Sequence, residues 1–168
     1  MLAGVAFLAL SAQVAIPFAP LGMPFTLQSQ AVAAVACLVG RRRALATTLA
    51  YLAVGAAGAP VFAGLGSGPT RLLGPHGGFL WGFVAAAWLV GGEHGRHRLV
   101  AWLGASALVL ATGWANLALW VGPLPAWRAG VVPFWLSDLG KATIAYLLCR
   151  RLGLGFRPPA VGRRGRPL

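Results

Sequence analysis

Six long apolar stretches, separated by short polar connections, constrain this chain more than any other feature. They run roughly over residues 2–18, 26–40, 44–62, 78–92, 99–122 and 132–149. A membrane-crossing helix needs about 20 mostly apolar residues, so the second and fourth stretches are expected to take in part of the loops before them. Charged residues make up only 10% of the 168 residues, whereas soluble domains carry about 25%. The sequence therefore predicts an all-α integral membrane protein, residues 1–168 forming a single domain of six transmembrane helices.

The arginines predict how these helices are oriented. Alternate connections hold eleven of them: Arg41, Arg42, Arg43, Arg96, Arg98, Arg150, Arg151, Arg157, Arg163, Arg164 and Arg166. The other three connections hold only Arg71 and Arg128. Basic residues accumulate in cytoplasmic loops, so both the N- and C-termini are predicted to be cytoplasmic, with a basic tail over 150–168. Because the positive charges lie in clusters between apolar runs, the net charge of +12 indicates membrane topology and no nucleic-acid partner.

One ion pair is predicted inside the last apolar stretch, in "FWLSDLGKATIAYLL" at 134–148. Asp138 is one of two acidic residues in the chain, and Lys141 is its only lysine. Their spacing places both side chains on one face of a helix, at a depth where ionisable groups are costly and mark cavities or partners. Two interpretations stay open: the pair neutralises itself, or a ligand completes it. We favour the ligand site, because an exposed loop would hold such a pair at no cost.

Four further side chains are candidate ligand contacts. Gln28 and Asn116 lie toward the same, non-cytoplasmic end as Asp138, and Tyr51 is another polar residue within a span. An intramembrane asparagine also commonly joins helices by hydrogen bonds, so that role is open for Asn116. Arg71 lies in the long connection 60–83, which is expected to fold back over a cavity; there it would meet an anionic ligand group or a lipid headgroup.

The sequence contains no catalytic or metal-binding motif. It has no Walker motif, no nucleophile beside a base and no paired catalytic carboxylates. Cys37 and Cys149 lack metal-ligand or disulfide spacing, and His94 and His97 are expected in a solvated turn. We therefore predict that the chain is not an enzyme and carries no cofactor, so uphill transport would draw on another subunit or on a gradient.

Three stretches together resemble the BioY family, the biotin-specific capture components of energy-coupling factor transporters. They are "PLGMPFTLQSQAVA" at 20–33, "GAAGAPVFAGLGSGPTRLLGPHGGFLWGF" at 55–83 and "PFWLSDLGKA" at 133–142. The chain departs from the typical pattern at His76 and Phe79, where the family has threonine and tyrosine. The resemblance implies a six-helix bundle with a biotin pocket near the extracellular surface, lined by Asp138 and Lys141.

The resemblance also implies a function and partners. The chain would capture biotin with high affinity outside the cell and support its uptake, as a multi-pass protein of the cell membrane. In that family the capture component works in membrane lipid with a transmembrane coupling subunit and two ATPase subunits that hydrolyse ATP, or alone, as a homo-oligomer. The alanines at 3, 6, 9, 12 and 15 would form either a packing ridge or the docking surface for that subunit.

Biotin suits the ion pair chemically. Its ureido N–H groups would donate to an ionised Asp138, and Lys141 would serve a carbonyl or the carboxylate, since charge-assisted hydrogen bonds are strong. Which end of biotin meets Lys141 is left open. Two alternatives remain: a capture component for another vitamin, such as thiamine or riboflavin, and a membrane scaffold without transport activity.

Overall fold

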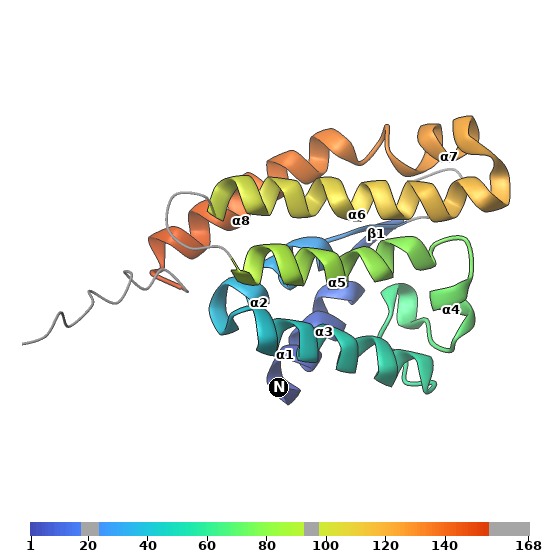
Figure 1. The fold of residues 1–168 in the computed structure, drawn as a ribbon. Helices are drawn as coiled ribbons and strands as arrows, with labels where there is room; N and C mark the ends of the chain where they lie inside the picture. Colours follow the sequence, from blue (N-terminus) through green and yellow to red (C-terminus); the bar gives the residue numbers. More distant parts are fainter. Residues whose placement is uncertain (18–23, 93–97, 155–168) are drawn as a thin grey trace, which may run out of the picture.

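The computed structural model describes residues 1–17, 24–92 and 98–154. Six longer helices form a bundle in which α3, α5 and α6 run side by side (Figure 1): α1 Leu2–Gln13, α2 Gln28–Val39, α3 Arg41–Ala56, α5 Gly77–Gly92, α6 Arg98–Val121 and α8 Trp135–Arg151. Three shorter elements lie between them: η2 Ala63–Leu65, α4 Thr70–Leu73 and α7 Pro123–Gly130. Each apolar stretch of the sequence contributes one long helix, so the helical class is confirmed.

A small antiparallel sheet, which the sequence analysis did not predict, interrupts the helical pattern. Strand β1 Ala15–Pro17 pairs with β2 Pro24–Thr26, with Ala15 opposite Thr26. The expectations that the first helix continues to residue 18 and that the second recruits its preceding loop are therefore wrong. Pro17 and Pro24 explain this difference, because proline cannot continue a helix and favours extended backbone in the residue before it.

The third helix also differs from its predicted stretch. It begins at Arg41 and ends at Ala56, whereas the sequence analysis placed it at 44–62. Gly58, with a φ of 106°, turns the chain out of the helical conformation, and Pro60 prevents its resumption. The fourth apolar stretch was expected to take in part of the glycine-rich loop before it, and α5 does so by one residue, since it begins at Gly77.

The closest helix pair is α5 and α6, and glycines make its approach possible. A Cβ atom on Gly78 would lie 2.3 Å from the carbonyl oxygen of Thr112, and one on Gly113 would lie 2.2 Å from the ring of Phe79. Small residues let backbones approach closely in membrane bundles. Helix α6 also packs against α7 and α8.

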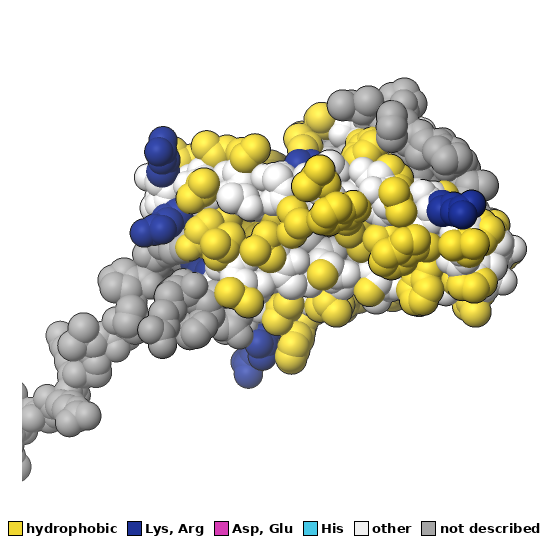
Figure 2. Space-filling model, turned by 90° about the horizontal axis from the view of Figure 1, so that it is seen from above, with side chains coloured by type: hydrophobic (Ala, Val, Ile, Leu, Met, Phe, Trp, Pro, Cys, Tyr) yellow, Lys and Arg dark blue, Asp and Glu magenta, His cyan; other side chains and the backbone are white. Residues whose placement is uncertain are grey.

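Large apolar side chains cover much of the outer surface. Leu2 is 85% exposed, Leu119 84% and Ile144 62%, while Tyr51 and Trp102 are fully buried; Figure 2 shows the apolar side chains spread across one face. Soluble proteins seldom expose such extensive apolar surface. Among the described helices, α6, with 24 residues, is the one long and apolar enough by itself to cross a membrane, and α1, α2 and α5 are apolar but shorter.

The two ends of the bundle differ in character. The starts of α3 and α6 and the end of α8 lie together (Figure 1) and bring Arg41, Arg98 and Arg150 to what we call the arginine end. There Arg41 stacks 4.3 Å from the ring of Trp88 and its Nε donates to the Trp88 carbonyl. The opposite end, which holds α4 and α7, is called the loop end. The predicted tail beyond residue 154, with His94 and His97, lies outside the described residues.

Candidate functional site

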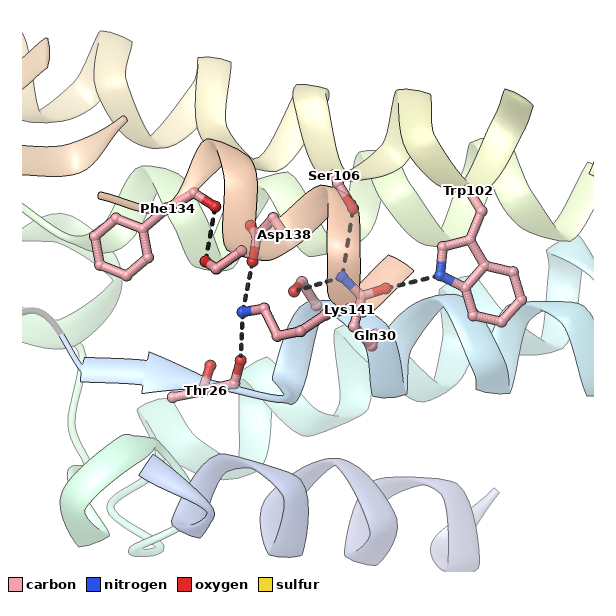
Figure 3. A network of polar contacts seen from close by, with 9 residues as sticks. Thr26, Gln30, Trp102, Ser106, Phe134, Asp138 and Lys141 are labelled. Carbon is pink, nitrogen blue, oxygen red and sulfur yellow. Dashed lines mark hydrogen bonds and ion pairs between the residues drawn. The ribbon is translucent and has the colours of Figure 1, made fainter. Parts of the chain in front are cut away.

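The first turns of α8 carry the ion pair that the sequence predicted. Helix α8 begins at Trp135, so Asp138 and Lys141 lie one turn apart near its loop end. The Nζ atom of Lys141 is 2.6 Å from Oδ1 of Asp138, and their side chains are 21% and 7% exposed. Both side chains therefore turn into the protein rather than toward its surroundings, as Figure 3 shows.

The β1–β2 hairpin closes over this pair. Lys141 Nζ donates to the carbonyl oxygen of Thr26 at 3.2 Å and lies 5.7 Å from the ring centre of Phe25. The Phe25 ring in turn packs 4.4 Å from Phe134, just before α8. Strand β2 thus supplies a hydrogen-bond acceptor and an aromatic surface that the sequence analysis did not assign to the site.

The pair retains hydrogen-bonding capacity. An ammonium group has three protons and a carboxylate has two acceptor oxygens. Among the described residues, two of the Lys141 protons are used, by Asp138 and Thr26, and no partner is found for Oδ2 of Asp138. One donor and one acceptor therefore remain side by side for a ligand.

Gln28 and Tyr51 meet at the start of α2. Gln28 is 3% exposed and its Nε2 donates to the hydroxyl of Tyr51, which is fully buried. The Tyr51 hydroxyl donates to the carbonyl of Val61 at 3.0 Å. The structure thus brings two of the predicted site residues together, two positions beyond Thr26, and joins them to the connection between α3 and α5.

Arg71 lies in the connection between α3 and α5, and Asn116 binds the backbone of that connection. Asn116 Nδ2 donates to the carbonyls of Gly74 and Pro75, both at 2.9 Å. The Arg71 side chain is exposed and lies against Gly66. Burial lowers the pKa of His76 below its ordinary value, and the charge of Arg71 lowers it further.

A second buried polar cluster, next to the ion pair in Figure 3, was not predicted as a unit. Trp102 Nε1 donates to Oε1 of Gln30 at 2.8 Å, and Gln30 Nε2 donates to Ser106 at 3.4 Å and to Ser29 at 3.3 Å. Trp102 and Ser106 are four positions apart on α6, and that shared face is the signal that could have found them.

Comparison with known proteins identifies the family. A model of the BioY family matches residues 1–157. The chain belongs to the BioY family. A probable biotin transporter BioY of Pyrococcus horikoshii is 34% identical over 88% of this chain and 90% of its own. The biotin transporter BioY of Thermotoga maritima is also 34% identical, over 88% of this chain and 89% of its own.

A solved structure supports the fold. The S-component for biotin from an ECF-type ABC transporter superposes with a TM-score of 0.72, covering 92% of each chain at 24% identity. The BioY family consists of transporter components and contains no enzymes, so the prediction that the chain is not an enzyme is confirmed. BioY proteins are membrane proteins, and the exposed apolar side chains described above are consistent with that location.

Proposed function

We propose that this chain captures biotin at its loop end, on the extracellular side, and serves its uptake as the substrate-specific component of an energy-coupling factor transporter. Membership of the BioY family supports biotin as the substrate, since the similar proteins of Pyrococcus horikoshii and Thermotoga maritima are named as biotin transporters. The observation that carries the assignment is the buried Asp138–Lys141 pair with its unused donor and acceptor.

In the proposed site, the ureido ring of biotin lies against the ion pair. An N–H of the ring donates to Oδ2 of Asp138, and the remaining proton of Lys141 goes to the ureido carbonyl or to the carboxylate of biotin. The apolar bicycle packs against the rings of Phe25 and Phe134, as aromatic side chains usually enclose small ligands. Gln28 and Arg71 are proposed to contact the rest of the ligand, with Tyr51 and Asn116 at the border of the site.

The proposed topology has six crossings, with the arginine end and both termini in the cytoplasm. It is supported by the arginine distribution and by the arginines that share one end of the bundle.

We further propose that ATP hydrolysis by two partner ATPases, transmitted by a transmembrane coupling subunit, drives the release of biotin. The chain is also proposed to form homo-oligomers. The alanine ridge is a candidate contact for the coupling subunit; Ala3 and Ala6 are exposed and Ala12 is buried.

Equilibrium binding of labelled biotin to the purified chain in detergent, without partner subunits, tests this function. We expect saturable binding that unlabelled biotin displaces and that thiamine and riboflavin do not. Displacement by one of those vitamins instead would replace biotin as the substrate. No binding to any of the three would favour a scaffold without transport activity.

A further inference from the structure

The outer connection, which we define as residues 61–75 between α3 and α5, is held at one end by a glutamine of α1. Gln13 accepts a hydrogen bond from the backbone N–H of Leu65 at 3.1 Å. Its Nε2 donates to the carbonyl oxygen of Phe62, also at 3.1 Å. One side chain thus satisfies an acceptor and a donor of the loop backbone that lie 49 and 52 residues away in the sequence.

The other end is held by Asn116 of α6. Its Nδ2 donates to both Gly74 and Pro75, which uses the two N–H groups that an asparagine amide has. The Tyr51 hydroxyl donates to the carbonyl of Val61, the first residue of the connection, and Trp81 Nε1 donates to the carbonyl of Leu72, which lies between the two ends. Side chains of α1, α3, α5 and α6 therefore all bind the backbone of one loop.

Leu65 shows that this arrangement is imposed by its surroundings. Its φ is 55°, in the left-handed region, which is unfavourable for a residue with a branched side chain and persists only where other contacts hold it. Its side chain is 66% exposed, so packing offers little compensation. Two sets of contacts hold it: the hydrogen bond from the Leu65 N–H to Gln13, and the two backbone hydrogen bonds between Phe62 and Gly66 that close the turn around Leu65.

Two polar side chains at the outer connection could contact a ligand: Arg71 within it and His76 directly after it. A Cβ atom on Gly66 would come within 2.8 Å of Arg71 Nε and 2.9 Å of its Cζ, so the Arg71 guanidinium lies directly over that glycine. His76 follows the clamped Pro75, and its Nε2 is the buried side-chain nitrogen without a hydrogen-bond partner among the described residues. Unpaired buried polar atoms are rare in native proteins and call for an explanation.

We propose that Gln13 and Asn116 are positioning residues, which hold the outer connection in its ligand-ready arrangement before biotin arrives. Asn116 then acts through the loop and makes no N–H contact with the ligand. This inference rests on the proposed function. Its physical basis is preorganisation: a loop already in place does not lose conformational freedom when the ligand binds.

Binding kinetics separate this role from direct contact. If only a fraction of the molecules has the loop in place, the apparent affinity falls by that fraction, through slower association. Loss of a direct contact acts instead mainly on dissociation. The test compares the parent with Gln13→Ala/Asn116→Ala, which removes four hydrogen bonds to the loop. Asp138→Asn is the control that removes a proposed direct contact.

We expect the double variant to associate with biotin about tenfold more slowly or worse, with dissociation changed by less than about twofold. Asp138→Asn should show the opposite pattern. Hydrogen exchange without ligand should become at least about tenfold faster at residues 62–74 of the double variant. Faster dissociation with unchanged association, or unchanged exchange in that segment, would overturn the proposal.

Two other outcomes are distinguished as follows: a parent that binds no biotin, and a double variant that does not fold. If the parent bound no biotin, the proposed function would fail, while hydrogen exchange would still decide whether the two side chains hold the loop. If the double variant did not fold, Gln13→Ala alone would serve, because Gln13 is exposed and its replacement leaves no buried cavity. That variant should show the same kinetic pattern to a smaller extent, and a change in dissociation alone would contradict the proposal.

Discussion

Two polar clusters lie side by side in the interior of this protein, and they differ in what they leave unused (Figure 3). In the cluster around Gln30, the N–H of Trp102 and both N–H groups of the glutamine amide have partners. In the Asp138–Lys141 pair, one carboxylate oxygen and one ammonium proton have none among the described residues. The first cluster is neutral and all these donors are hydrogen-bonded. The second is charged and keeps one acceptor and one donor that could bind a ligand.

The comparison distinguishes two roles of buried polar groups: the Gln30 cluster joins helices, and the Asp138–Lys141 pair is available to bind a ligand. A satisfied neutral network fixes the relative position of α2 and α6 and needs nothing more. A buried ion pair is costly unless its remaining hydrogen-bonding groups are also satisfied. The predictions below test this division, from the largest expected effect to the smallest.

Removing either charge of the pair should abolish most biotin binding. Asp138→Asn and Lys141→Met keep the approximate size of the side chains, yet each removes a charged contact and leaves the other charge buried alone. We expect roughly 100-fold weaker binding or worse, measured by equilibrium binding in detergent. Parent-like affinity in both variants would show that the pair is only structural.

Gln30→Leu should give the reverse pattern. The variant leaves the Trp102 N–H buried without its acceptor, so we expect a loss of about 1–3 kcal/mol in the free energy of unfolding. Biotin affinity should change by less than about threefold, since the cluster is saturated. The double variant Gln30→Leu/Trp102→Phe should lose less than the sum of the single changes. A large loss of affinity at unchanged stability would place Gln30 in the ligand site.

Gly140→Ala tests whether biotin affinity depends on the charged side chains or on the stability of the helix that carries them. Gly140 lies between the two charged residues, and a Cβ atom there would meet open space. Alanine favours a helix over glycine by about 0.5–1 kcal/mol, so thermal stability should rise slightly. Biotin affinity should stay within about twofold of the parent, and a clear loss would indicate that ligand lies against this position.

His76 should make the smallest contribution, visible in the pH dependence of stability. Burial and Arg71 lower its pKa in the folded protein, so below about pH 6.5 the unfolded chain binds a proton more readily. Stability from this group is complete above the unfolded pKa and is lost as pH falls toward the folded pKa. Melting temperatures at pH 7.5 and pH 5 should therefore differ more in the parent than in His76→Thr. An equal or larger difference in the variant would contradict this sign.

The sequence predicted the six helices and the inward-facing pair because both follow from local patterns. Apolar length predicts the helices, and the spacing of Asp138 and Lys141 predicts their shared face. The β1–β2 hairpin was not predicted, because two three-residue strands give no local pattern and their pairing depends on which residues of the two segments meet. The partners of Gln30 and Asn116 escaped because they come from elements distant in sequence, and no local pattern specifies which helix or loop a polar side chain meets.

The most direct test of the central claim is an experimental structure of this chain with bound biotin. We predict that a ureido or carboxylate atom of biotin lies within hydrogen-bond distance of Asp138 or Lys141, with the Phe25 and Phe134 rings against the bicycle. Biotin bound elsewhere, with the pair still closed on itself and on the Thr26 carbonyl, would contradict the account.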